Sequence, residues 1–251
     1  MAHTTESPVA LVTGAAQGLG HRIAARLHAA GYRVVLSDIS LAAAEQAALD
    51  LDASGETVMP LALDVARRED FEAALAATLR RWGGLQVLVN NAAVTRATPV
   101  MEISAAEFAE VVNINLGSTF SGCQVMGRYM ADQGYGRIIN MASLAGQNGG
   151  TSTGAHYAAS KGGIITLTKV FAKELAARGV TVNAIAPGPI DSPMVKALVP
   201  PERLPGLLNA IPVGRLGDTD FVGDLVVQLA RPEAYFTTGA TLDINGGIFM
   251  R

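Results

Sequence analysis

The sequence of 251 residues has little cysteine, few aromatic residues and no large excess of charge of one sign. The single cysteine, Cys123, cannot form an internal disulfide, and its apolar surroundings favour a packed thiol in a reducing compartment. Lysine and arginine number 19 against 22 aspartate and glutamate residues, so the overall charge does not recruit nucleic acid or an anionic membrane surface. A small-molecule ligand fits this composition better.

Long hydrophobic runs are also missing. No apolar run reaches the roughly 18 residues needed to span a bilayer, and residues 1–8 lack the basic start and apolar core of a secretory signal. We therefore predict a cytoplasmic protein with a short N-terminal leader and no membrane partner. The sequence contains no internal repeat, low-complexity tract or charge run, and we predict no metal site.

Short β-rich runs alternate with longer helical patterns along the whole chain. We predict seven strands, at Val9–Thr13, Arg33–Ser37, Val58–Leu63, Gln86–Asn90, Arg137–Met141, Thr181–Ala186 and Thr241–Ile244. We predict six helices, at Gly18–Ala30, Leu41–Ala53, Arg67–Trp82, Ser104–Asp132, Ala155–Arg178 and Thr219–Leu229. The alternation favours an α/β fold with a doubly wound, seven-stranded parallel sheet, in a single domain over residues 1–251.

One stretch breaks the alternation. Between residues 187 and 217 the chain has seven prolines with apolar residues between them. This stretch is too long for an ordinary connection and too apolar for a linker. We predict that residues 188–217 form a short substrate lid, whose apolar inner face argues against a very highly charged substrate.

Glycines follow the first predicted strand directly and lead into the first helix, in the run Thr13–Gly20. A glycine cluster alone is more often a turn, and no Gly-Lys-Ser/Thr follows to make a nucleoside triphosphate loop. Between a strand and a helix, however, glycines let the backbone approach a pyrophosphate that the helix N-terminus attracts. The cofactor contacts predicted here are Gly14, Gln17, Gly18, Leu19 and Gly20.

Asp38 closes the second predicted strand, where a carboxylate can accept hydrogen bonds from the adenosine ribose. The same carboxylate would repel a 2′-phosphate, and Gln17 supplies no charge to neutralise that phosphate. The pattern therefore favours NAD over NADP. The alternative is that Asp38 caps the following helix.

The third and fourth predicted strands also end in polar residues, at the edge where ligands of open parallel sheets collect. Asp64 and Val65 could meet the adenine, although Asp64 could equally cap the helix that follows. Asn90, Asn91 and Ala92 are predicted cofactor contacts, although asparagines there can also satisfy backbone groups.

Tyr157 and Lys161 lie four residues apart in a predicted helix, which places both side chains on one face. A phenol has a pKa of about 10, and a neighbouring cation favours its ionised form. Tyr157 could therefore exchange a proton with a substrate oxygen. The pair alone is a weak signal, because this spacing is common on solvated helices.

Together, the glycine turn, Asn90–Ala92 and the Tyr-x-x-x-Lys pattern resemble the short-chain dehydrogenase/reductases over nearly the whole chain. The resemblance implies a Rossmann-like fold, a nicotinamide cofactor and a homotetramer or dimer. It implies the catalytic residues Ser143, Tyr157, Lys161 and Asn115, the last anchoring a water of the proton path. It also implies that Pro187, Gly188, Ile190 and Ser192 hold the nicotinamide. Two positions depart from the family pattern, Ser192 in place of threonine and Ala93 in place of glycine.

The predicted activity is NAD-dependent interconversion of a secondary alcohol and a ketone, with Tyr157 as general base or acid, its pKa lowered by Lys161 and the nicotinamide. Ser143 would hold the substrate oxygen. His156 is either a substrate contact or a local packing or capping residue. One alternative is an NADPH-linked 3-oxoacyl carrier-protein reductase, which Asp38 and Gln17 oppose. Another is a dinucleotide-binding protein without catalysis.

Overall fold

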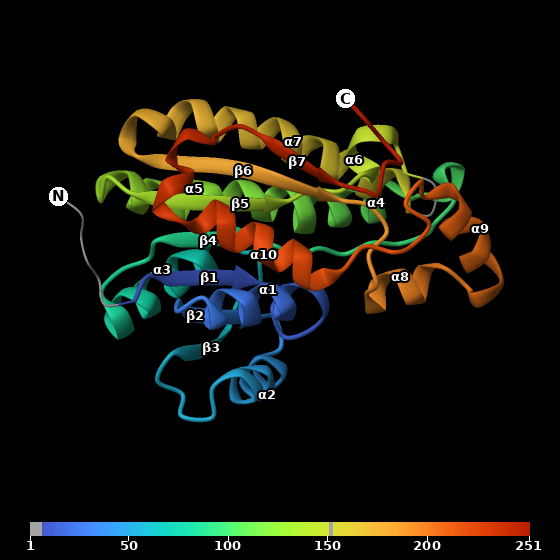
Figure 1. The fold of residues 1–251 in the computed structure, drawn as a ribbon. Helices are drawn as coiled ribbons and strands as arrows, with labels where there is room; N and C mark the ends of the chain where they lie inside the picture. Colours follow the sequence, from blue (N-terminus) through green and yellow to red (C-terminus); the bar gives the residue numbers. More distant parts are fainter. Residues whose placement is uncertain (1–6, 151–152) are drawn as a thin grey trace.

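The computed structural model of the chain describes residues 7–150 and 153–251 (Figure 1). Residues 1–6, which belong to the expected leader, and residues 151–152 lie outside this part. The strands are β1 (Val9–Thr13), β2 (Arg33–Asp38), β3 (Val58–Ala62), β4 (Val87–Asn90), β5 (Gly136–Met141), β6 (Val180–Pro187) and β7 (Thr241–Ile244). They form one parallel sheet in the order β3-β2-β1-β4-β5-β6-β7.

The sheet confirms the predicted α/β fold, and its strand order explains where a ligand can bind. The connections run outward in one direction from β1 to β3 and in the other from β4 to β7. Ligands of such sheets bind at the carboxyl ends of the strands, beside the point where the order reverses. Here that point lies between β1 and β4, the two strands that carry the glycine turn and the paired asparagines.

Helices cover both faces of the sheet. They are α1 (Gly18–Ala29), α2 (Leu41–Leu51), α3 (Arg68–Trp82), α4 (Ala105–Val112), α5 (Ser118–Asp132), α6 (Ala145–Asn148), α7 (Ala155–Leu175), α8 (Pro193–Leu198), α9 (Leu204–Ala210) and α10 (Thr219–Ala230). One core cluster lies under α1, α2 and α10, and a second lies under α3, α5 and α7. The central strands are buried on both faces, which is why they read as unbroken apolar runs.

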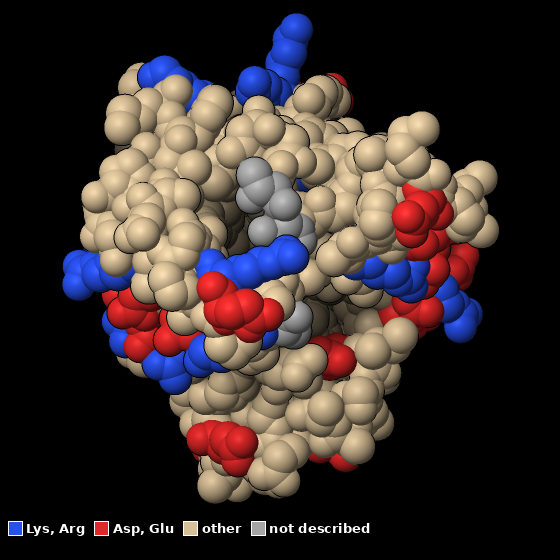
Figure 2. Space-filling view, turned by 90° about the vertical axis from the view of Figure 1, so that its right-hand side faces the viewer, with Lys and Arg blue, Asp and Glu red and all other residues tan. Residues whose placement is uncertain are grey.

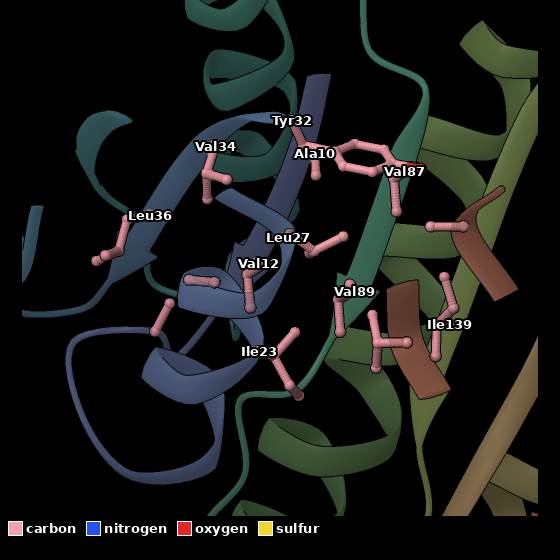
Figure 3. Close-up of a cluster of buried hydrophobic side chains, with 14 of the residues drawn as sticks. Ala10, Val12, Ile23, Leu27, Tyr32, Val34, Leu36, Val87, Val89 and Ile139 are labelled. Carbon is pink, nitrogen blue, oxygen red and sulfur yellow. The ribbon is translucent and has the colours of Figure 1, made fainter. Parts of the chain in front are cut away.

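Figure 3 shows the first cluster, where Ile23 and Leu27 of α1 point towards the side chains of β1 and β4. Both are fully buried, as are Val12 and Val89 on the strands. Burying an aliphatic side chain of this size contributes about 1.5–3 kcal/mol. The Ile23 and Leu27 side chains lie within α1, so they anchor α1 to the sheet close to the glycine turn.

The predicted helix Ser104–Asp132 is interrupted by one π-helical turn, Asn113–Gly117, between α4 and α5. Asn113 and Ser118 keep right-handed helical angles on either side, so the chain direction is not broken. Within the turn the carbonyl of Asn115 accepts hydrogen bonds from the hydroxyls of Ser118 (3.2 Å) and Thr119 (2.9 Å). π-helical turns are rare and are found mostly as single turns inside α-helices, as here.

The expected lid segment contains two short helices, α8 and α9, which lie together at the end of the molecule to which the strand arrows point (Figure 1). Pro193 occupies the first turn of α8, where its missing N–H costs no helical hydrogen bond. The Ser192 side chain caps the same helix by accepting from the Val195 amide at 3.3 Å. In the part of the chain that the structure describes, no helix is long and apolar enough to cross a membrane.

Candidate active site

The glycine turn between β1 and α1 has a backbone that other residues cannot adopt. Gly14 and Gly18 have φ of 61° and 58°. A Cβ added to Gly20 would lie 2.2 Å from the Gly14 carbonyl oxygen and 2.5 Å from the Asn91 side chain. Gln17 precedes the helix without capping it, and the first turn of α1 contains no acidic residue. The free N–H groups and the positive end of the helix dipole therefore suit a pyrophosphate.

The paired asparagines after β4 use their side chains within the protein. Asn91 donates to the carbonyls of Thr13 (2.9 Å) and Gly14 (3.1 Å), so it braces the glycine turn. Asn90 is buried and donates to the Asn140 side chain at 2.8 Å. Of the alternatives left open for these residues, the structure supports backbone and core hydrogen bonding by their amides. The cofactor contacts of residues 90–92 stay a prediction.

Asp38 stands beside the glycine turn at the end of β2. Its carboxylate accepts from the Ala16 amide and from the Ser40 amide, both at 3.2 Å. The N-cap of α2 is Ser40, whose hydroxyl accepts from Ala43, so Asp38 is not the cap. The structure therefore places a half-buried carboxylate against the glycine turn, as the ribose-binding hypothesis requires.

Asp64 occupies the same edge of the sheet, one strand further out. Its carboxylate accepts from the Ala66 amide at 3.0 Å. The helix α3 begins at Arg68 with Arg67 as its N-cap, so the capping alternative for Asp64 is wrong. The neighbouring Val65 packs against the second core cluster.

Ser143, Tyr157 and Lys161 come together at the carboxyl end of β5. Tyr157 and Lys161 lie on α7, and both are buried. The Ser143 side chain lies close enough to the Tyr157 hydroxyl to lower its pKa, and it accepts from the Ala145 amide at 3.1 Å. The Lys161 ammonium lies 5.6 Å from the centre of the Tyr157 ring and donates to the Met141 carbonyl at 2.6 Å.

Burial dominates the electrostatics of this group. Desolvation lowers the pKa of Lys161 from 10.5 to about 8. Desolvation also raises the pKa of Tyr157 above its ordinary value, and the hydrogen bond with Ser143 only partly offsets this. The expected lowering of the Tyr157 pKa by Lys161 is therefore not found. The ammonium is turned towards the Met141 carbonyl, so its charge does not offset the desolvation of the phenol.

Asn115 joins the same group from the π-helical turn and is fully buried. Its side chain forms two hydrogen bonds with the backbone of Val94, accepting at 2.8 Å and donating at 3.0 Å. It also donates to Ser160 at 3.0 Å, and Ser160 donates to the Tyr157 carbonyl at 2.7 Å. Asn115 thus ties the loop after β4 to α7, next to the tyrosine.

The segment after β6 lies at the same edge of the sheet. The Gly188 amide donates to the Ile244 carbonyl at 2.7 Å, and a Cβ on Gly188 would lie 2.8 Å from the Cα of Asn245. Pro187 ends β6, while Ile190 and Ser192 are buried just beyond it. This segment therefore connects the sheet to the lid helices at a close backbone approach that only glycine allows.

His156 does not face a cavity. It is fully buried, and its ring bonds the Glu107 carboxylate at 2.9 Å and the Tyr157 amide at 2.8 Å. The packing and capping alternative is thus the one that fits. Sequence reasoning missed Glu107 and Ser160, which hold the residues around Tyr157, and no local pattern identifies either of them.

A cavity of about 610 Å³ opens beside this group, between the loop after β4, the start of α7 and the lid helices. Its described walls include Thr98, Gly154 and Leu207, and the one charged residue among them is Arg203. Figure 2 views this end of the molecule, where the surface is hollowed and basic and acidic side chains are intermingled. The cavity is large enough for a ligand of moderate size.

A parallel sheet with a glycine turn at its switch point and a buried tyrosine–lysine pair at its carboxyl edge defines a dinucleotide-binding oxidoreductase. Residues 14–249 match the family model described as enoyl-(acyl carrier protein) reductase. The chain belongs to the short-chain dehydrogenase/reductase family. The close-packed glycine turn and the backbone N–H groups at the start of α1, which no side chain caps, fit the nicotinamide dinucleotide of that family.

Curated relatives match the chain from end to end. The 3-oxoacyl-(acyl-carrier-protein) reductase of Vibrio cholerae is 41% identical over 245 residues, which cover 98% of each chain. The corresponding reductases of Escherichia coli and Pseudomonas aeruginosa are each 38% identical, again over 98% of both chains. This chain is therefore similar to reductases that act on ketones carried by acyl carrier protein.

Proposed function

We propose that the protein reduces the ketone of a 3-oxoacyl thioester to a secondary alcohol. The end-to-end similarity to 3-oxoacyl-(acyl-carrier-protein) reductases carries this proposal. It favours the carrier-protein alternative over the first expectation, which was interconversion of a free secondary alcohol and a ketone. The intact group of Ser143, Tyr157 and Lys161 opposes a role in binding alone.

In this reaction the protein supplies a proton and a position for the carbonyl. The bound nicotinamide dinucleotide supplies the hydride that joins the carbonyl carbon. The Tyr157 hydroxyl gives its proton to the carbonyl oxygen as the C–O double bond becomes single, and solvent then restores that proton. A raised pKa suits Tyr157 for this direction, because the phenol holds its proton at neutral pH. The Ser143 hydroxyl holds the carbonyl oxygen beside the phenol.

The test compares substrates directly. The protein is assayed for oxidation of the reduced cofactor with a 3-oxoacyl thioester on acyl carrier protein, on pantetheine and on N-acetylcysteamine, and with simple ketones. We expect turnover with the thioesters, and we expect Tyr157→Phe to abolish it while cofactor binding remains. Turnover of simple ketones alone would restore the first expectation. A wild type that binds cofactor but reduces nothing would support the non-catalytic alternative.

We propose further that NADH is the preferred cofactor. Asp38 places a negative charge against the glycine turn, and Gln17, the exposed residue of that turn, is uncharged. A 2′-phosphate next to the Asp38 carboxylate would meet charge repulsion. Titration of the protein with NADH and NADPH should therefore give tighter binding of NADH. Equal or tighter binding of NADPH would show that Asp38 does not select the cofactor.

We propose that copies of the chain associate through a face formed by α4, α5 and α7. The apolar side chains Phe108, Phe120 and Val170 are 43%, 42% and 57% exposed on these helices, and α7 contacts both α4 and α5. Exposed apolar side chains gathered on neighbouring helices mark interaction surfaces. Sedimentation equilibrium should give an oligomer for the wild type and a smaller species for Phe120→Glu. A monomeric wild type would refute the proposal.

A further inference from the structure

The start of α7 has an unusual cap. The first N–H groups of a helix have no partner within the helix, and a polar side chain at the N-cap usually accepts from one of them. Here the N-cap is Gly154, which has no side chain to do so. The ring of His156, two residues further on, instead accepts from the amide of Tyr157 at 2.8 Å.

This contact determines the roles of both ring nitrogens. Because Nδ1 of His156 accepts from the Tyr157 amide, the ring proton is on Nε2. Nε2 therefore donates to Oε1 of Glu107 on α4, at 2.9 Å. The same carboxylate oxygen accepts from the hydroxyl of Thr98 at 2.7 Å. These hydrogen bonds lower the pKa of Glu107, so the carboxylate is ionised at neutral pH.

The surrounding backbone leaves space for the buried ring. A Cβ on Gly154 would lie 2.3 Å from Cε1 of His156 and 2.8 Å from the Arg96 carbonyl oxygen. The Gly154 amide donates to that carbonyl at 2.8 Å. Gly154 and Thr98 both line the cavity beside the active site. A continuous chain of hydrogen bonds therefore runs from the cavity wall, through Glu107 and His156, to the backbone of Tyr157.

We propose that His156 and Glu107 are positioning residues that hold Tyr157 in register with the cavity wall at Thr98. The proposal rests on the proposed proton transfer from Tyr157 to a ketone. Neither residue touches the reacting atoms. They fix the first turn of α7, and a shift of the phenol by about 1 Å can lower the rate about 100-fold.

Three variants separate the parts of this arrangement. His156→Leu removes both ring hydrogen bonds. Glu107→Ala removes the carboxylate, which is partly exposed, so the fold is expected to tolerate the change. Glu107→Gln keeps an amide oxygen that can accept from both His156 and Thr98. The matched control is Glu110→Gln, one turn along α4, where the carboxylate bonds only Arg96 among the contacts described.

We expect His156→Leu and Glu107→Ala each to lower kcat about 10- to 100-fold while KM for the reduced cofactor changes less than about 2-fold. The double variant should lose little more than the worse single one, because both act through one chain of contacts. Glu107→Gln should recover most of the rate, and the control should keep it all. Unchanged kcat, effects that multiply, or a rise in the cofactor KM equal to the fall in kcat would each overturn the proposal.

A second readout needs no substrate. Hydrogen exchange of the Tyr157 amide should be at least about 10-fold faster in His156→Leu than in the wild type, with exchange in the last turns of α7 unchanged. An unchanged rate at Tyr157 would overturn the positioning role whatever the substrate is. If the wild type reduces only a simple ketone, the thioester proposal fails, and the same kcat ratios measured with that ketone still decide the role of His156 and Glu107.

Discussion

Lys161 is a buried cation without a buried acidic partner in the described contacts, and this makes the stability of the fold depend on pH. Its ammonium donates a hydrogen bond to the Met141 carbonyl at 2.6 Å, and desolvation lowers its pKa from 10.5 to about 8. In the unfolded chain the same group keeps its ordinary pKa. Between these two values the unfolded state holds a proton that the folded state has released. Stability therefore rises with pH across this window.

The perturbation is Lys161→Met, which keeps an unbranched side chain and removes the titrating group. A shift of this size corresponds to about 3 kcal/mol of unfavourable free energy in the folded state below pH 8, at about 1.4 kcal/mol for each pH unit. We expect the variant to be more stable than the wild type near neutral pH. Its advantage should shrink by about 2 kcal/mol between about pH 7 and about pH 9.5.

The assay is urea unfolding of both proteins at a series of pH values and one protein concentration. Tyr32 and Cys123, whose pKa values burial raises to about 12, are present in both proteins and cancel in the difference. Tyr157, whose pKa burial also raises, is likewise present in both proteins, so the group at residue 161 should dominate the change of that difference with pH. A difference in unfolding free energy that stays constant over this range would show that Lys161 is not desolvated as its burial implies.

Three further predictions concern the cofactor and the cavity. Gly20→Ala should weaken dinucleotide binding at least about 10-fold and destabilise the fold by about 1–3 kcal/mol, because its added methyl meets the Gly14 carbonyl. Gly84→Ala is the control, because its added methyl meets only a flexible side chain. Calorimetric titration measures the binding, and thermal melts measure the stability. Asp38→Ser should tighten NADPH binding about 10-fold relative to NADH, and an unchanged ratio would remove Asp38 from cofactor selection. Arg203 is the one charged residue in the described cavity wall, and a guanidinium pairs well with a phosphate. Arg203→Gln should therefore raise KM several-fold for a thioester that carries a phosphate and leave KM for an N-acetylcysteamine thioester unchanged; equal effects on both would contradict this pairing.

The sheet could be predicted from sequence because its signal is local. Each strand is a short apolar run followed by a helical pattern, and the observed β2 and β5 differ from the predicted strands by one residue. The glycine turn was also predictable, since positive φ at Gly14 and Gly18 is a demand of the backbone itself. These features depend on residues next to one another in the chain.

The contacts that hold the site join residues far apart in the sequence, and the periodicity of the sequence does not predict such contacts. His156 and Glu107 are separated by 49 positions, and Asn91 meets the Thr13 carbonyl across 78. The π-helical turn at Asn115 was missed for the same reason, because local helical patterning does not distinguish a π turn from an α turn. The predicted lowering of the Tyr157 pKa by Lys161 was not found, because the Lys161 side chain is directed towards its hydrogen-bond partner on β5, the Met141 carbonyl.

The polar residues at the carboxyl edge of the sheet fall into two groups: those bonded within the protein and those proposed to bind a ligand. The side-chain NH2 groups of Asn90 and Asn91 and the whole amide of Asn115 are hydrogen-bonded within the protein, so they stiffen the site. The proposed recognition of cofactor and substrate therefore rests on backbone N–H groups at the start of α1 and on the side chains of Asp38 and Arg203. Substitutions in the first group should therefore change stability and rate together, while those in the second should change which cofactor or substrate is bound.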